Sequence, residues 1–134
     1  MLPKRKKTIR QKTIDRLDGL FSEYIRRLAM KLEHGCQRCK SFKTDWKQLQ
    51  CAHFHSRRKY STRWHPLNSA GVCGGCHMFL DSHAIEKVAF FRNLLGEYEF
   101  DKLNIAAEFV THGTDYATVG LYYREKLKEL EEGI

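Results

Sequence analysis

The stretch CQRCKSFKTDWKQLQCAHFHSRRKYSTRWHPLNSAGVCGGCH, residues 36–77, decides how this chain of 134 residues folds. It begins with the pair Cys36 and Cys39 and ends with the pair Cys73 and Cys76, and two residues separate the members of each pair. A CxxC turn puts two thiolates on one side of a tight loop, and two such turns supply four sulfurs for a tetrahedral Zn²⁺. We therefore predict a closed, structural Zn²⁺ site whose binding free energy replaces part of a small core. An oxidised or redox-active dithiol pair is the alternative.

The flanks of this stretch show the apolar spacing of amphipathic helices. We predict helices over 14–33, 81–95, 101–111 and 115–131, with Gly35 ending the first and Gly96 the second. Residues 47–54 (KQLQCAHF) suit one strand of a hairpin, and Cys51 within them is interpreted as a small buried side chain. The fold class is α+β, a small unit of short strands stapled by the four-cysteine zinc site and flanked by helices.

The predicted organisation is a mobile basic arm over 1–13 followed by a single domain over 14–134. Within the domain we separate three parts. They are an N-terminal helix at 14–35, a central unit at 36–83 that contains the two CxxC turns (the zinc knuckles), and the C-terminal helices at 84–134. A hydrophobic share of 42% excludes a wholly disordered chain. The first residues lack the apolar core of a secretory signal, and no apolar run is long enough to cross a membrane. A cytoplasmic location without a membrane partner is therefore expected.

Charge is divided unevenly along the chain. Residues 1–64 hold 18 Lys and Arg against 5 Asp and Glu, whereas residues 65–134 hold 6 against 11. A basic half and an acidic half favour a polyanionic partner on one face, and DNA is the partner that we expect. The arm would contact phosphates, because cationic side chains release counterions from DNA. A solvated tail that keeps the protein in solution is the alternative for the arm.

Three polar residues between and just beyond the knuckles carry the chemistry of the sequence: His53, Asn68 and His77. In phosphodiester hydrolysis a neutral imidazole takes a proton from water, and a carboxamide can hold that imidazole in the productive tautomer. A second imidazole can bind a divalent metal that stabilises charge on the phosphate and the leaving oxygen. His77 and Asp81 are four residues apart, so a helix starting at the second knuckle would place both on one side.

The segment 36–77, with its CxxC, LQCAHF, Asn68 and CxxCH, resembles the zinc-knuckle HNH endonucleases. Within them it is most similar to phage recombination proteins of the NinG (Rap) type. The closer similarity rests on LFSEYIRRL at 20–28, on LQCAHFHSRRKYSTRWHPLN at 49–68 and on the helical tail. The HNH part covers about a third of the chain, and the NinG-like similarity covers most of it.

This resemblance implies a ββα-metal unit in which a hairpin carries His53 as general base and a loop carries Asn68 to orient it. His77 would bind the catalytic divalent ion, Mg²⁺ or Mn²⁺, and Asp81 would be a second ligand. The sequence departs from the family at Ala52, where many HNH proteins have a metal-binding Asp or His. His55, two residues beyond His53 on a strand, is the next candidate ligand, and His83 follows it.

Each of these site residues also has a structural interpretation. His53 could pack against the knuckle, Asn68 could form a turn after Pro66 and Leu67, and His77 could replace a cysteine on zinc. Asp81 could be a carboxylate favoured by the dipole at the start of a helix.

A basic loop, residues 56–64 (SRRKYSTRW), lies between the proposed base and Asn68. Arginine forks and hydroxyls bind phosphates, and Tyr or Trp can stack on unpaired bases. We expect Arg57, Arg58, Lys59 and Arg63 to contact nucleic acid. Trp64 would either stack on bases or lie in the core.

The leading hypothesis is a metal-dependent DNA endonuclease, and the resemblance implies recombination and branched DNA as its setting. Two alternatives stay open: a non-catalytic zinc-stabilised DNA-binding protein, which Ala52 favours, and a protein-interaction module whose apolar helices bind a partner. The oligomeric state is left open, although a homodimer would suit symmetric cuts at a junction.

Overall fold

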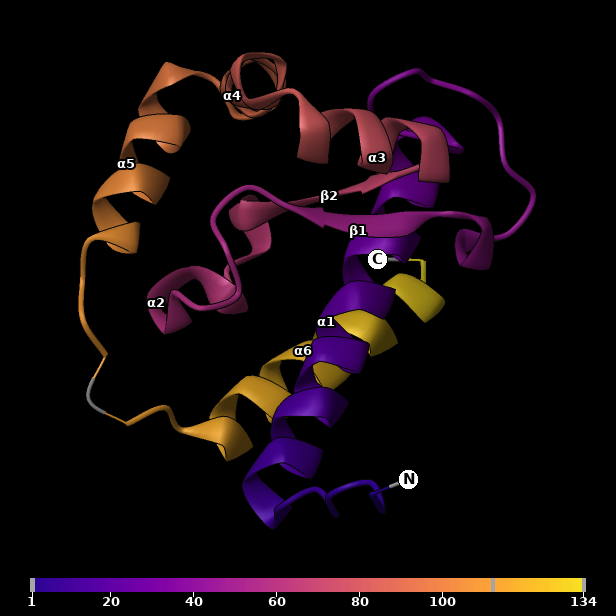
Figure 1. Cartoon of the computed structure of the whole chain (residues 1–134). Coiled ribbons are helices and arrows are strands. Elements are labelled where there is room, and N and C mark those ends of the chain that lie inside the picture. The colour runs from indigo at the N-terminus through magenta and orange to yellow at the C-terminus, as the bar shows by residue number, and fades with distance from the viewer. Residues whose placement is uncertain (1, 112, 134) are drawn as a thin grey trace.

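The computed structural model describes residues 2–111 and 113–133 (Figure 1). Its longest element, α1 (Ile9–Glu33), starts earlier than the sequence predicts. The Thr8 hydroxyl accepts from the Gln11 amide at 3.1 Å, and the Gln11 side chain accepts from the Thr8 amide at 3.0 Å. This reciprocal capping box begins the helix at Ile9. The predicted arm over 1–13 is therefore wrong for residues 9–13, which are helical.

One face of α1 forms the long axis of the core. Its buried residues follow the predicted spacing, and α6 (Tyr116–Glu131) packs across them with Tyr123, which is 2% exposed. In Figure 1 the two helices cross in the lower half of the molecule. Leu32, which the apolar spacing assigns to the same stripe, is instead 60% exposed. The buried residues of α1 are Ile14, Leu17, Phe21, Ile25 and Ala29.

The sheet is a two-stranded antiparallel hairpin that crosses the other half of α1 (Figure 1). β1 (Gln50–His53) pairs with β2 (Ser69–Val72) so that His53 lies opposite Ser69 and Gln50 opposite Val72. Gly71 allows the close approach of β2 to α1, because a Cβ on it would lie 2.6 Å from the Cβ of Ala29. The observed strand is shorter than the predicted 47–54, since η1 (Trp46–Gln48) occupies the start of that range.

Three helices follow β2: the first packs on β1, the second joins it to the third, and the third lies beside the connection between the strands (Figure 1). They are α3 (Gly74–Ser82), α4 (Ala84–Leu95) and α5 (Glu97–Ala107). The helix predicted at 81–95 is confirmed over Ala84–Leu95 and ends at Gly96 as expected, but residues 81 and 82 belong to α3, because the helix breaks at His83. There the Ser82 hydroxyl donates to the carbonyls of Met78 and Phe79, and the His83 ring stacks on Phe79 at 4.1 Å. These side chains satisfy carbonyls that a continuing helix would have bonded.

The remaining elements differ from the predictions at their ends. α5 starts four residues earlier than predicted and ends at Ala107, and α6 begins after Asp115, whose carboxylate accepts from the Thr118 amide at 3.1 Å. Two short helices, α2 (Tyr60–Arg63) and η2 (Pro66–Asn68), lie in the connection between the strands. Within the described residues there are six α-helices and one two-stranded sheet, which confirms the α+β class. No helix of this part of the chain is long and apolar enough to cross a membrane.

Candidate functional site

The four cysteines of the two knuckles come together as predicted. Their sulfur atoms all lie within 4.8 Å of one another, and the Sγ atoms of Cys39 and Cys73 are 3.8 Å apart. In a tetrahedral Zn²⁺ site with bonds near 2.3 Å, neighbouring sulfurs are separated by about 3.8 Å. All four cysteines are free of disulfides. The cluster therefore fits a structural metal such as zinc. Within the described residues it is the only group of three or more His, Cys, Asp or Glu side chains that could hold a metal ion.

The surroundings of the cluster shift the pKa values of two of its thiols in opposite directions. Hydrogen bonds with Ser41 lower the pKa of the Cys39 thiol to about 6, and the Arg38 guanidinium donates to Cys76 Sγ at 3.3 Å. Burial raises the pKa of the Cys76 thiol to about 12, so a bound cation would be needed to ionise this thiol near neutral pH. The Arg38 guanidinium also stacks on Phe79, 4.0 Å from the ring centre, which holds its charge beside the sulfurs.

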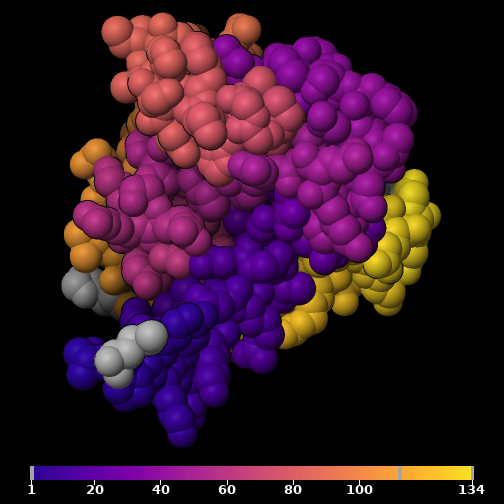
Figure 2. Space-filling model, turned by 45° about the vertical axis from the view of Figure 1, so that its right-hand side comes forward, coloured from indigo at the N-terminus to yellow at the C-terminus, as the bar shows by residue number. Residues whose placement is uncertain are grey.

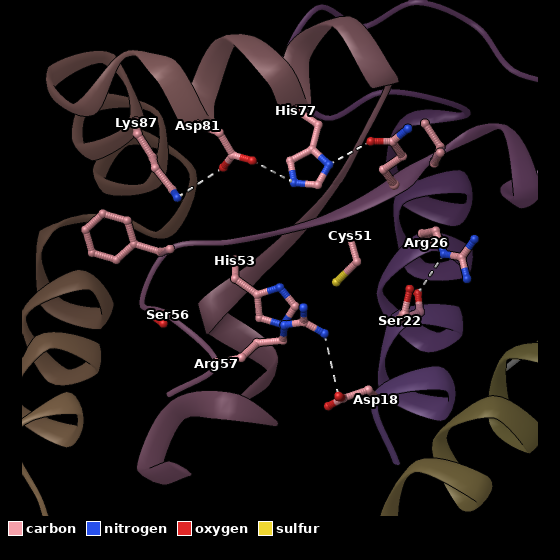
Figure 3. Close-up of a pocket in the computed structure, with 13 residues that line it drawn as sticks. Asp18, Ser22, Arg26, Cys51, His53, Ser56, Arg57, His77, Asp81 and Lys87 are labelled. Carbon is pink, nitrogen blue, oxygen red and sulfur yellow. Dashed lines mark hydrogen bonds and ion pairs between the residues drawn. The ribbon is translucent and has the colours of Figure 1, made fainter. Parts of the chain in front are cut away.

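A cleft of about 760 Å³ opens between α1, β1 and α3 (Figure 3). The cleft contains the predicted general base His53 from β1, the predicted ligands His77 and Asp81 from α3, and Arg57 of the basic loop. On the face shown in Figure 2, the surfaces of α1, of the basic loop and of α3 lie next to one another. The full lining is Asp18, Ser22, Arg26, Leu49, Gln50, Cys51, His53, Phe54, Ser56, Arg57, His77, Asp81 and Lys87.

The His53 imidazole is a neutral base at the wall of this cleft. Burial, and to a lesser degree the cation of Arg57, lower its pKa to about 4. The ring packs on Phe21, with 5.7 Å between centroids, and within residues 2–111 and 113–133 it makes no hydrogen bond. A neutral imidazole with an unused nitrogen can accept a proton.

His77 and Asp81 form the other wall, one turn apart on α3. His77 Nε2 lies 3.4 Å from Asp81 Oδ2, as the spacing of four residues predicts. Adjacent ligands of a divalent ion with bonds near 2.1 Å are about 3 Å apart, so this pair could share one ion after a small movement. Lys87 Nζ lies 3.5 Å from Asp81 Oδ1, and Gln50 Oε1 lies 2.7 Å from His77 Nδ1 (Figure 3).

Asn68 acts on the backbone and not on the His53 ring. Its Oδ1 accepts from the His55 amide at 2.8 Å, its Nδ2 donates to the His55 carbonyl at 3.1 Å, and its own carbonyl accepts from the Phe54 amide at 2.8 Å. The side chain is fully buried. The prediction that Asn68 orients the imidazole directly is corrected: it clamps the chain immediately after His53, where the strand ends.

His55 is turned away from the cleft, and its prediction as a ligand of the catalytic ion is wrong for this structure. Its Nε2 lies 2.9 Å from Asn104 Oδ1 on α5, and it does not line the cleft. The strand ends at His53, and with it ends the alternation of side chains between the two faces of the sheet. Residues 53 and 55 therefore do not share a face. Ala52 is fully buried opposite Ala70, which shows that a side chain at this position enters the core.

The basic loop divides into a buried and an exposed part. Arg63 is 13% exposed; it donates to both carboxylate oxygens of Asp18, at 3.0 and 2.6 Å, and to the Arg57 carbonyl at 2.8 Å. Arg63 is therefore occupied by the protein, which is against the prediction that it contacts nucleic acid. Arg57, Arg58 and Lys59 remain at the surface, and the first two line a second hollow that shares Asp18, Ser56 and Arg57 with the cleft.

Trp64 belongs to the core, as one of its two interpretations predicted. It is 6% exposed, its Nε1 donates to Asp18 at 3.0 Å, and its carbonyl accepts from the Tyr123 hydroxyl. Stacking of Trp64 on a base is therefore not supported. His83 lies outside the cleft lining and caps α3.

Several cleft residues were not singled out from the sequence. Asp18, Ser22 and Arg26 follow one another at steps of four on α1, so they lie on one face of the helix beside its apolar stripe. The sequence could have indicated this polar face from the same spacing. Gln50 had no such signal, because its position beside α3 depends on the hairpin register.

Comparisons with known proteins returned no relationship: no family model, no curated protein and no solved structure matches the chain.

Proposed function

We propose that this protein is a zinc-stabilised, metal-dependent DNA endonuclease of the HNH type that acts in recombination or in the processing of branched DNA. The observation that carries the proposal is one cleft lined both by the neutral His53 imidazole and by the pair His77 and Asp81. A general base and a pair of metal ligands in the same cleft are groups that can hydrolyse a phosphodiester.

The residues would divide the work as follows. His53 would accept a proton from the attacking water, and Asn68 would hold the chain after His53 in place through the His55 backbone. His77 and Asp81 would hold the divalent ion, Mg²⁺ or Mn²⁺. When bound, such an ion supplies positive charge that stabilises the phosphate and the leaving oxygen. The four-cysteine cluster would carry zinc and would fix the start of α3, where His77 follows Cys76 directly.

Charge supports DNA as the substrate class. Arg57 borders both the cleft and the neighbouring hollow, Arg58 lines the hollow, and Arg26 lines the cleft from α1. Cationic side chains at such positions bind phosphates and make binding depend on salt. The preference for branched DNA comes from the resemblance alone.

The decisive experiment measures cleavage of supercoiled plasmid and of a labelled four-way junction, with and without Mg²⁺ or Mn²⁺. The His53→Ala variant should lose cleavage while it keeps its zinc content and its circular dichroism spectrum. The His83→Ala variant is the matched control, because His83 is an exposed histidine outside the cleft and should keep activity. Absence of cutting with every divalent ion, or equal cutting by His53→Ala, would overturn the proposal.

A second candidate is a zinc-stabilised DNA-binding protein without catalysis. The specific observation in its favour is the small number of ligands for a catalytic ion. Among the described residues of the cleft, only His77 and Asp81 lie close enough to share an ion. His55 is turned away from the cleft, and Ala52 is buried. It predicts DNA binding that is unchanged by divalent ions and by His77→Ala.

A further inference from the structure

The structure assigns Gln50 as the positioning residue for His77: its amide oxygen holds the imidazole in the Nδ1–H tautomer, so that Nε2 faces Asp81. This inference deepens the proposed function and rests on it where it concerns the catalytic ion. It names a residue that belongs to neither the CxxC pairs nor the His–Asn–His set.

The hydrogen bond itself determines the tautomer. Gln50 Oε1 lies 2.7 Å from His77 Nδ1. An amide oxygen can only accept a hydrogen bond, so Nδ1 must carry the proton. In a neutral ring the remaining lone pair is then on Nε2, the atom that lies 3.4 Å from Asp81 Oδ2. The lone pair of the imidazole and a carboxylate oxygen thus face the same small space, as two ligands of one cation do.

The Gln50 amide lies against the second knuckle. Its Nε2 lies beside Gly74, where an added Cβ would be 3.3 Å from it. Because Gly74 has no side chain, the amide can lie against the start of α3 and reach His77 one turn further on. The hairpin register puts Gln50 opposite Val72, immediately before the knuckle, so the strand delivers the amide to this point.

The sequence suggested that the carboxamide of Asn68 orients the His53 ring. In the structure a carboxamide does orient a histidine ring, but it is that of Gln50 and the ring is that of His77. The Asn68 side chain bonds only to the amide and carbonyl of His55, whereas the Gln50 side chain bonds to a ring nitrogen. Partners of this kind orient metal-bound histidines, and their loss commonly weakens metal affinity by about 10- to 100-fold.

The first test reads the tautomer directly and needs neither DNA nor the catalytic ion. Long-range ¹H–¹⁵N spectra of the zinc-loaded full chain distinguish Nδ1–H from Nε2–H histidines, and His77→Ala assigns the signal. We expect Nδ1–H in the parent protein and in Gln50→Glu, which keeps an acceptor. Gln50→Leu should shift His77 toward Nε2–H. An Nε2–H ring in the parent, or no shift in Gln50→Leu, would overturn the assignment.

The second test measures Mn²⁺ affinity of the same zinc-loaded proteins by titration calorimetry. Gln50→Leu should weaken binding by about 10- to 100-fold, and Gln50→Glu should restore it. Ser22→Ala is the matched control, because Ser22 lines the cleft from α1 on its opposite side (Figure 3). Parent-like affinity in Gln50→Leu would overturn the role toward metal.

The two failures can be told apart. If the tautomer shifts as expected but the protein never cuts DNA, Gln50 positions His77 and the nuclease proposal fails. If cleavage needs His53 and His77 but the tautomer ignores Gln50, the nuclease stands and the positioning role fails.

Discussion

The two carboxylate oxygens of Asp18 on α1 each accept a hydrogen bond from the Arg63 guanidinium on α2, from Nε at 3.0 Å and from Nη2 at 2.6 Å. The two side chains are 18% and 13% exposed, and the indole of Trp64 donates to the same carboxylate. A largely buried, bidentate ion pair thus ties the basic loop to the longest helix. Its geometry gives Asp18 a structural role at the edge of the cleft, with Arg57 as a further cation 3.7 Å away.

Arg63→Ala is expected to lower the free energy of unfolding by about 2–4 kcal/mol, because it leaves the Asp18 carboxylate buried without its main partner. Arg57→Ala is the matched control: that side chain is 60% exposed and should change stability by less than about 0.5 kcal/mol. Urea unfolding followed by circular dichroism measures both. Equal effects would mean that the Asp18–Arg63 pair contributes nothing specific.

Asn68→Ala should lower the free energy of unfolding by about 2–4 kcal/mol, since it leaves both the amide and the carbonyl of His55 without their hydrogen-bond partners. Asn68→Asp should be at least as destabilising as Asn68→Ala, because it buries a carboxylate and turns one of its oxygens toward the His55 carbonyl. Hydrogen exchange at the His55 amide reports the loss locally. Parent-like protection of that amide in Asn68→Ala would contradict the clamp.

Removal of the metal by a strong chelator should unfold the region around the knuckles, because structural zinc contributes on the order of 10 kcal/mol in model peptides. Cys36→Ser should lose the metal in the same way, whereas Cys51→Ser should keep one zinc per chain. Elemental analysis and thermal unfolding measure both variants. Cys51 is a suitable control because it is the one cysteine outside the cluster.

Acid should destabilise the protein through His53. Its pKa is about 4 in the folded protein and near 6.5 in an unfolded chain, so the unfolded state binds more protons between these values. Stability from this group is present above pH 6.5 and is lost as the pH falls toward 4. His53→Phe should flatten the pH dependence of unfolding in that window. NMR titration of the parent should place the His53 midpoint near 4, and a midpoint near 6.5 would contradict the desolvated position.

Substitution of Arg57 or Arg58 by Gln should weaken DNA binding and reduce its dependence on salt, by about one unit of slope for each phosphate that the variant no longer neutralises. Both side chains lie at the surface beside the cleft. Lys128→Gln on α6 is the control with the same change in charge. Fluorescence anisotropy at several salt concentrations gives the slopes, and identical slopes for all three variants would place the DNA elsewhere.

Local patterns were enough to predict much of this architecture. The apolar steps of α1 and α6 predict their buried faces, because they depend on residues that are close along the chain. The two CxxC pairs are local in the same way, and their meeting was predicted because four thiolates complete one zinc site. The spacing of His77 and Asp81 worked because it is local as well.

The errors concern contacts between distant segments. His55 bonds to Asn104 and Arg63 to Asp18, partners that lie 49 and 45 residues away along the chain, and no local pattern announces them. A side chain that could bind a metal or a phosphate in isolation is occupied by the fold instead. The break at His83 was missed because its cause, stacking on Phe79 and capping of α3, is an arrangement of polar groups within an apolar pattern.

The order of the cluster ligands along the chain has a consequence for synthesis on the ribosome. Cys36 and Cys39 emerge first, then both strands, and the ligand set becomes complete only with Cys76. His77 is the next residue to be added. The metal scaffold and the last histidine of the cleft thus become available at nearly the same moment of translation. A nascent chain passes through no stage in which the cleft histidines are all present while a cysteine of their scaffold is still missing.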